Sequence, residues 1–227
     1  LNHDRDQKNE DRKATIRREV YLNAVTETLS AFAEIGGLIS RDFEAHPVKE
    51  PLRNFLVAVH KVSLVADSRA ALLAKELAAQ VTEWYFAVYR PAVEHHRALL
   101  DVPRYQEQIE TCKQEGKRIA TDIARAWERG ESSEVIERLL KSDERFIELR
   151  LRAEEFIRTA QKDAEPARNK VASAMLASDR ECRLTLSRLV AALRKEIYLE
   201  PLEAELIERD ASDRERAETL LRSVGLS

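Results

Sequence analysis

Apolar residues recur at steps of three and four along nearly the whole chain, and polar residues fill the positions between them. Such steps place the apolar side chains on one face of an α-helix. Gly and Pro residues divide the pattern into separate segments. We therefore predict helices over about residues 4–35, 52–66, 69–100, 104–129, 133–209 and 212–224.

Local signals predict where several of these helices begin and end. Gly36 and Gly37 end the first helix, and Pro51 suits the first turn of the second. Asp67 or Ser68 can cap the start of the third helix, unless one long helix passes through.

Proline also predicts distortion inside the long helices. Pro91 removes one backbone hydrogen bond, so we expect a kink near residues 87–91. Pro166 interrupts the long stretch over 133–209, which leaves two kinked helices or one broken helix there. After Pro201, Ser212 begins a capping-box sequence, so the last helix is expected to start at that serine.

The stretch over 133–209 contains heptad spacing, which is typical of a coiled-coil seam. In the preceding helix, over 104–129, we place Trp127 on the inner side and expect Gly130 to end the helix. The seam residues predicted from the spacing are Leu139, Phe146, Leu149, Ala153, Phe156 and Ala160.

These elements predict an all-α fold, an elongated antiparallel helical bundle with long, Pro-kinked, coiled-coil-like helices in a single domain over 1–227. The charged helix over 1–35 has three initial turns without an apolar stripe, so we expect it to project into solvent or to continue from an upstream membrane anchor. A heptad stripe that extends past its own bundle must bury against another chain, which predicts a homo-oligomer.

Composition supports a helical, mixed-charge protein. Only 5 Gly and 6 Pro occur among 227 residues, too few turn-forming residues for a sandwich or barrel. The 38 basic and 41 acidic residues give a net charge of −3, and the signs alternate along the chain, so nucleic acid is not an expected partner. The longest stretch without charged residues, 171–178, is far shorter than a membrane span.

The sequence offers no arrangement of residues typical of a catalytic or metal site. None of the five His residues follows a Glu or Asp by three positions, and no strand precedes the Gly36–Gly37 pair. We therefore predict a non-enzyme without cofactor or metal. Cys112 and Cys182 are interpreted as thiols of a reducing compartment, and whether they pair stays open.

An aromatic run over residues 84–91 is the most unusual local composition. On a helix these side chains surround the whole circumference, so one or two of them must face away from a simple core. The alternatives are burial against a neighbouring helix and an anchor for a partner or ligand. The candidate surface residues are Trp84, Tyr85, Phe86, Tyr89, Arg90 and Trp127.

Two segments, residues 17–22 (RREVYL) and 61–68 (KVSLVADS), carry a family resemblance. Over about the first 80 residues the chain resembles a loose group of uncharacterised bacterial proteins, in which an N-terminal membrane helix leads into a charged helical cytoplasmic region. The resemblance implies no activity and no catalytic residues. It implies a cytoplasmic location at the inner membrane, with membrane contact only through residues absent from this chain.

Taken together, the sequence predicts a non-enzymatic helical interaction or scaffold domain, the soluble part of a membrane-tethered oligomer with protein partners. The alternative is a helical-bundle sensor that binds a small ligand between helices near residues 84–89 and Trp127.

Overall fold

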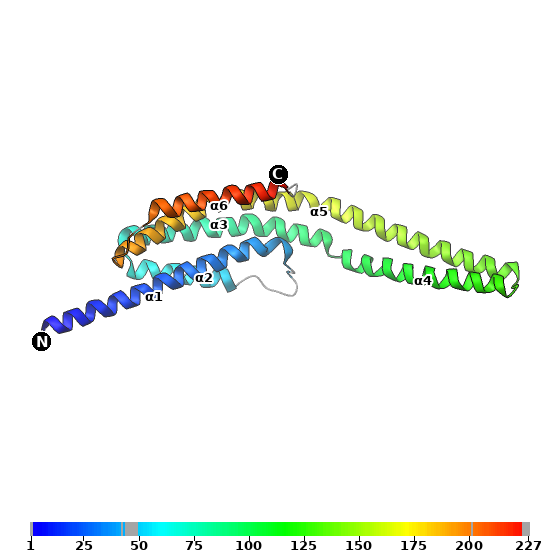
Figure 1. Cartoon of the computed structure of the whole chain (residues 1–227), viewed down its shortest axis with the longest axis horizontal. Helices are drawn as coiled ribbons and strands as arrows, with labels where there is room; N and C mark the ends of the chain where they lie inside the picture. The colour runs from blue at the N-terminus through cyan, green and yellow to red at the C-terminus, as the bar shows by residue number, and fades with distance from the viewer. Residues whose placement is uncertain (1, 42, 44–49, 201, 224–227) are drawn as a thin grey trace. The chain divides into compact units, whose positions relative to one another are not determined.

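A computed structural model describes residues 2–41, 43, 50–200 and 202–223, and every regular element in those ranges is helical (Figure 1). The all-α prediction is therefore confirmed. No helix within these ranges combines the length and apolar character needed to cross a bilayer. The elements are α1 (Asn2–Gly37), the 3-10 helix η1 (Leu38–Ser40), α2 (Glu50–Val65), α3 (Ser68–Leu99), α4 (Val102–Glu128), α5 (Ser133–Glu196) and α6 (Glu203–Ser223).

Most helix ends follow the local signals. The α1 helix ends at Gly37, and α2 contains Pro51 in its first turn. Between α2 and α3, the Asp67 side chain accepts a hydrogen bond from the backbone N–H of Ala70 at 2.9 Å, which confirms Asp67 as the N-cap. Gly130 has a φ of 66°, the left-handed conformation in which helices commonly end.

The predicted interruption at Pro166 is not observed, because α5 is one helix of 64 residues with this proline inside it. Buried alanines flank the proline, at Ala164 and Ala167, so the packed face of the helix continues across it. The α3 helix likewise continues through Pro91.

The predicted start of the last helix is wrong, since α6 begins at Glu203 and Ser212 lies inside it. Leu202, at a φ of 51°, marks the turn in the chain. Glu203 and Glu205 then place negative charge in the first helical turn, where the helix dipole favours it. The helix therefore starts before the capping-box sequence is reached.

The chain divides into two compact units, one formed by Leu1–Val93 with Asn169–Ser227 and the other by Glu94–Arg168. We call them unit 1 and unit 2. The α3 and α5 helices each contribute residues to both units. The single domain predicted over 1–227 stays a prediction. The prediction that the first three turns of α1 project into solvent concerns side chains that lie outside the described ones.

In unit 1, side chains from α1, η1, α2, α3 and α5 form one apolar core. Each large side chain removed from water contributes about 1.5–3 kcal/mol before the entropic cost of ordering is counted. The largest fully buried members are Trp84, Phe55, Ile35, Leu38, Leu77 and Leu189.

Unit 2 is built on an antiparallel pair, α4 and the first half of α5, which lie side by side in Figure 1. Two contacts fix their register. The Tyr105 and Phe156 rings stack with centroids 3.9 Å apart, and a Cβ added at Gly116 would lie 3.7 Å from the Oδ1 of Asp143. We call this pair of helical segments the α4–α5 hairpin.

Candidate functional site

The aromatic run on α3 is mostly part of the unit 1 core. Trp84 is only 2% exposed, and its ring meets Phe32 edge-on at a centroid distance of 5.3 Å. Tyr85 is also buried and stacks on Tyr89 at 5.5 Å, while Tyr89 meets Phe43 edge-on at 5.7 Å. These five rings therefore hold the unit 1 core together, and little of the Trp84 or Tyr85 surface is exposed for a partner to contact.

Phe86 and Arg90 are the members of this run that face outward. Phe86 is 49% exposed and touches Tyr85 edge-on at 5.3 Å, and Arg90 is exposed one turn further along. Trp127, the sixth candidate, belongs to unit 2, whereas the other five belong to unit 1. The predicted surface is therefore reduced to Phe86, Arg90 and part of Tyr89 within unit 1.

Tyr85 has an electrostatic environment that keeps its hydroxyl protonated. Burial, helped by the neighbouring Tyr89 and the Glu34 carboxylate and opposed by Arg41, raises the pKa of Tyr85 to about 12. Glu34 and Arg41 form an ion pair near this ring. Because the phenol stays neutral at physiological pH, Tyr85 is not suited to act as a base.

A second polar cluster in unit 1 joins three elements. The Tyr21 hydroxyl of α1 donates a hydrogen bond to Glu196 of α5, whose other carboxylate oxygen accepts the backbone N–H of Asp67 at 3.0 Å. The Arg17 Nε donates to the Val65 carbonyl at 3.1 Å. Burial and the hydrogen bond to Glu196 raise the pKa of Tyr21, so this cluster has a structural role in the turn between α2 and α3.

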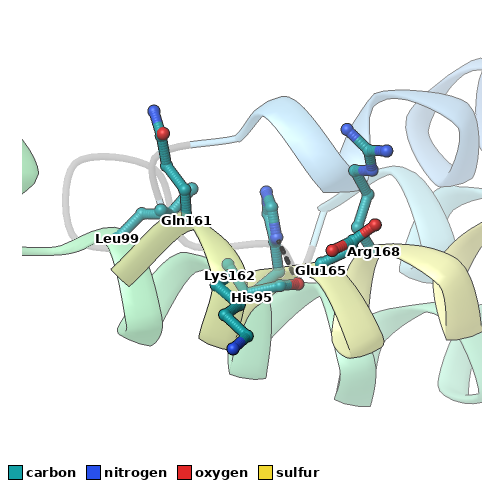
Figure 2. A pocket seen from close by; sticks show the side chains of 7 residues that line it. His95, Leu99, Gln161, Lys162, Glu165 and Arg168 are labelled. Carbon is teal, nitrogen blue, oxygen red and sulfur yellow. Dashed lines mark hydrogen bonds between the residues drawn. The ribbon is translucent and has the colours of Figure 1, made fainter. Parts of the chain in front are cut away.

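Unit 2 contains a hollow of about 450 Å³ between the last turns of α3 and the α5 helix (Figure 2). The His95 Nδ1 lies 3.2 Å from the Ala164 carbonyl oxygen, which can only accept, so Nδ1 donates this hydrogen bond. The hollow is open, and its polar groups form no nucleophile–base pair. The residues lining it are His95, Leu99, Gln161, Lys162, Ala164, Glu165 and Arg168.

The seam of the α4–α5 hairpin follows strict heptad steps on both helices. Each of these positions is buried or half-buried. On α4 they are Val102, Tyr105, Ile109, Cys112, Gly116, Ile119, Ile123 and Ala126. On α5 they are Ile136, Leu139, Asp143, Phe146, Arg150, Ala153, Ile157 and Ala160.

This phase corrects three sequence predictions. Leu149, predicted as a seam residue, is half-buried beside the seam, and Arg150 occupies the seam position. Ala126 is 5% exposed and occupies the seam, whereas Trp127, expected on the inner side, is 67% exposed. Phe156, predicted as a seam residue, is 37% exposed and lies beside the seam with its ring on Tyr105. In all three cases the 3-4 alternation places the neighbouring residue inward.

Beside the seam, exposed apolar side chains gather on one flank of the hairpin. In heptad terms they occupy e and b positions, and the e positions of antiparallel helices lie on the same side. Leu151 is 54% exposed there, although leucine side chains are usually buried in soluble proteins. We call this surface the hairpin flank, formed by Ala120, Ala124, Trp127, Leu140, Ile147 and Leu151 together with the charged Lys117 and Glu144.

Sequence reasoning missed this flank because it weighed aromatic composition more heavily than heptad phase. The signal was present in the steps from Leu140 to Ile147 and Leu151, seven and four residues apart. Such a second stripe beside the seam residues predicts an apolar face outside the two-helix contact.

The remaining candidate chemistry is limited. Cys112 and Cys182 are both buried and free, and burial raises the pKa of Cys182 to about 12. Within the described ranges, no three His, Cys, Asp or Glu side chains converge as metal ligands.

Comparison of the chain with protein-family models, curated proteins and solved structures finds no match. The resemblance of the first 80 residues to membrane-anchored bacterial proteins therefore stays a prediction.

Proposed function

We propose that this chain is a helical protein–protein interaction module that binds its partner on the hairpin flank. The observation that carries the proposal is the exposed stripe Leu140, Ile147 and Leu151 on α5, with Trp127 beside it on α4. Contiguous exposed apolar residues mark binding surfaces more often than isolated ones do.

The chemistry of the hairpin flank is that of a docking surface. A Trp with aliphatic neighbours is typical of the residues that dominate binding energy in protein interfaces. Covering a Leu or Ile side chain contributes about 1.5–3 kcal/mol, part of which offsets the entropy lost on association. The regular helices beneath the flank present these side chains without reorganisation.

Site-specific photo-cross-linking tests this proposal. A photoreactive amino acid replaces Leu151 on the hairpin flank, and in a matched variant it replaces Glu155, which is exposed one turn away on α5. In cells that make the protein natively, we expect discrete protein adducts from position 151 and none from position 155. Equal yields from both positions, or none from position 151, would contradict the proposal.

A second candidate function is a small-ligand sensor, which the hollow beside His95 favours, although none of the residues lining that hollow belongs to the ligand site predicted near residues 84–89 and Trp127. Thermal-shift measurements against a panel of metabolites test it, with Arg168→Ala as the variant that alters the hollow. A ligand that raises the melting temperature of the native protein but not of the variant supports a sensor function. A flat response over the panel argues against it.

The tethering part of the proposal rests on the resemblance alone. We propose a place at the cytoplasmic face of a membrane, reached through residues outside this chain. Sedimentation of the native gene product after salt and alkaline washes tests this. Retention in the membrane pellet supports tethering, and recovery in the supernatant contradicts it.

A further inference from the structure

We infer that the partner on the hairpin flank is a second copy of this chain, with α5 of each copy packed against α4 of the other. This inference rests on the proposed function and names its partner. The two hairpins then form a four-helix arrangement about a two-fold axis parallel to the helices.

The shape of the hairpin flank fits this arrangement. Its α5 side carries large residues, Leu140, Ile147 and Leu151, whereas its α4 side carries the small Ala120 and Ala124, with Trp127 near the end of α4. A two-fold axis along the helices sets Leu140, at one end of the large residues, against these alanines of the other copy. Ridge-into-groove contact of this kind is how helices pack.

The register of the hairpin determines which residues meet. Tyr105 lies level with Phe156, and Gly116 lies opposite Asp143. In that register Leu140 is level with Ala120. Because an axis parallel to the helices leaves levels unchanged, Leu140 of one copy meets Ala120 of the other.

The charges of the hairpin flank show the same complementarity. Lys117 of α4 and Glu144 of α5 are exposed, at one level and of opposite sign. Neither side chain has an ion-pair partner among the residues that the structure describes, whereas Lys113 pairs with Glu110 along α4. In the two-fold arrangement each Glu144 faces the Lys117 of the other copy, which gives two equivalent pairs.

The seam of the hairpin is also thin enough to benefit from a second hairpin. Several of its positions hold small residues, such as Gly116, Ala153 and Ala160, or polar ones, such as Asp143 and Arg150. A two-helix pair with such small and polar positions among its large apolar ones buries less apolar surface than a four-helix arrangement does. Docking two hairpins covers the flank of both.

Charge exchange on the full chain tests the inference. Analytical ultracentrifugation of the native chain is expected to show a dimer. Glu144→Lys places two lysines at each contact and Lys117→Glu places two glutamates there, so each variant is expected to weaken the dimer about tenfold. Glu155→Lys makes the same charge change off the flank and is expected to leave the dimer unaltered.

Mixing the two variants gives the decisive result. In a heterodimer of Glu144→Lys with Lys117→Glu, both contacts again join opposite charges, so the mixture is expected to dimerise within about threefold of the native affinity. The double variant Glu144→Lys/Lys117→Glu is expected to recover likewise as a homodimer. Circular dichroism establishes that each variant retains native helicity.

Three outcomes overturn the inference. They are a native chain that stays monomeric at high concentration, a Glu144→Lys variant that dimerises as well as the native chain, and single variants that do not rescue each other. If cross-links from position 151 still reach a different protein, the proposed function stands and only the identity of the partner fails. If position 151 gives no adduct of any kind, both fail.

Discussion

At the residue scale, two glycines of unit 2 differ in whether the backbone conformation requires a glycine. Gly130 has a φ of 66°, where a side chain is strained, although an added Cβ has no neighbour within 4 Å. Gly116 is in the middle of α4, where an added Cβ meets Asp143 at an ordinary contact distance of 3.7 Å. The first glycine is required by conformation, whereas the second only weakens its helix.

The substitution Gly130→Ala is therefore expected to lower the free energy of unfolding by about 1–2 kcal/mol, the cost of a left-handed non-glycine residue. Gly116→Ala is its matched control and is expected to raise the free energy of unfolding by about 0.5–1 kcal/mol. Urea unfolding followed by circular dichroism measures both. A destabilised Gly116→Ala variant would show that the hairpin seam has no room for a methyl group.

Titration of Tyr85 predicts a loss of stability at alkaline pH. The unfolded chain releases this phenolic proton near pH 10, whereas the folded protein holds it to about pH 12. The stabilisation is therefore complete below pH 10 and declines as the pH rises toward 12. Cys182, whose pKa is raised in the same direction, adds to the loss from about pH 9 upward.

Unfolding in urea between pH 8 and 11.5 checks this prediction. Tyr85→Phe is expected to flatten the fall in stability above pH 10 and to leave its pH dependence below pH 9 unaltered. Tyr198→Phe, at a ring that is 96% exposed, controls for the removal of one tyrosine. An identical alkaline slope in native and Tyr85→Phe proteins would contradict the assignment.

At the element scale, signals contained in a few neighbouring residues were predictable, and signals that depend on phase over many residues were not. Asp67, Gly37 and Gly130 act on adjacent backbone groups, so their roles follow from sequence. Whether Ala126 or Trp127 faces the seam depends on the 3-4 alternation over the whole of α4. One misplaced step rotates the assigned face by about 100°.

The start of α6 and the hairpin flank illustrate the same limit. Leu202 has a left-handed backbone that its residue type does not signal, so the turn before α6 could not be read from the sequence. The hairpin flank depends on which residues pair across α4 and α5. That register is a tertiary property, set by contacts such as Tyr105 with Phe156.

The N-cap of α3 gives a prediction at this scale. Asp67→Ala removes the acceptor for the Ala70 N–H and is expected to lower the free energy of unfolding by about 0.5–2 kcal/mol. Asp67→Asn keeps a side-chain oxygen at the cap and is expected to retain most of that stability. Both variants leave the backbone N–H of residue 67 available to Glu196, so thermal unfolding isolates the cap.

At the scale of the whole molecule, the two units differ in what stabilises them. The largest side chains that are less than 2% exposed, including Trp84, Phe55 and Leu189, all belong to unit 1. In unit 2 the hairpin seam interrupts its large apolar residues with small or polar ones, such as Gly116, Asp143 and Arg150. Cooperative opening is easiest where few buried apolar contacts must be broken, so unit 2 is expected to open first.

Hydrogen exchange followed by mass spectrometry tests this difference and its coupling to self-association. Amides of α4 are expected to exchange faster than those of α3 around residues 77–88. If hairpins pair through their flanks, the dimer stabilises the folded hairpin more as the protein concentration rises. Dilution is then expected to speed amide exchange in α4 and to leave the exchange rates of residues 77–88 unchanged. Glu144→Lys, whose dimer is about tenfold weaker, should show the same loss of protection at about tenfold higher concentration than the native chain. Exchange in α4 that is independent of concentration in the native chain would mean that the hairpin is stable without a second copy.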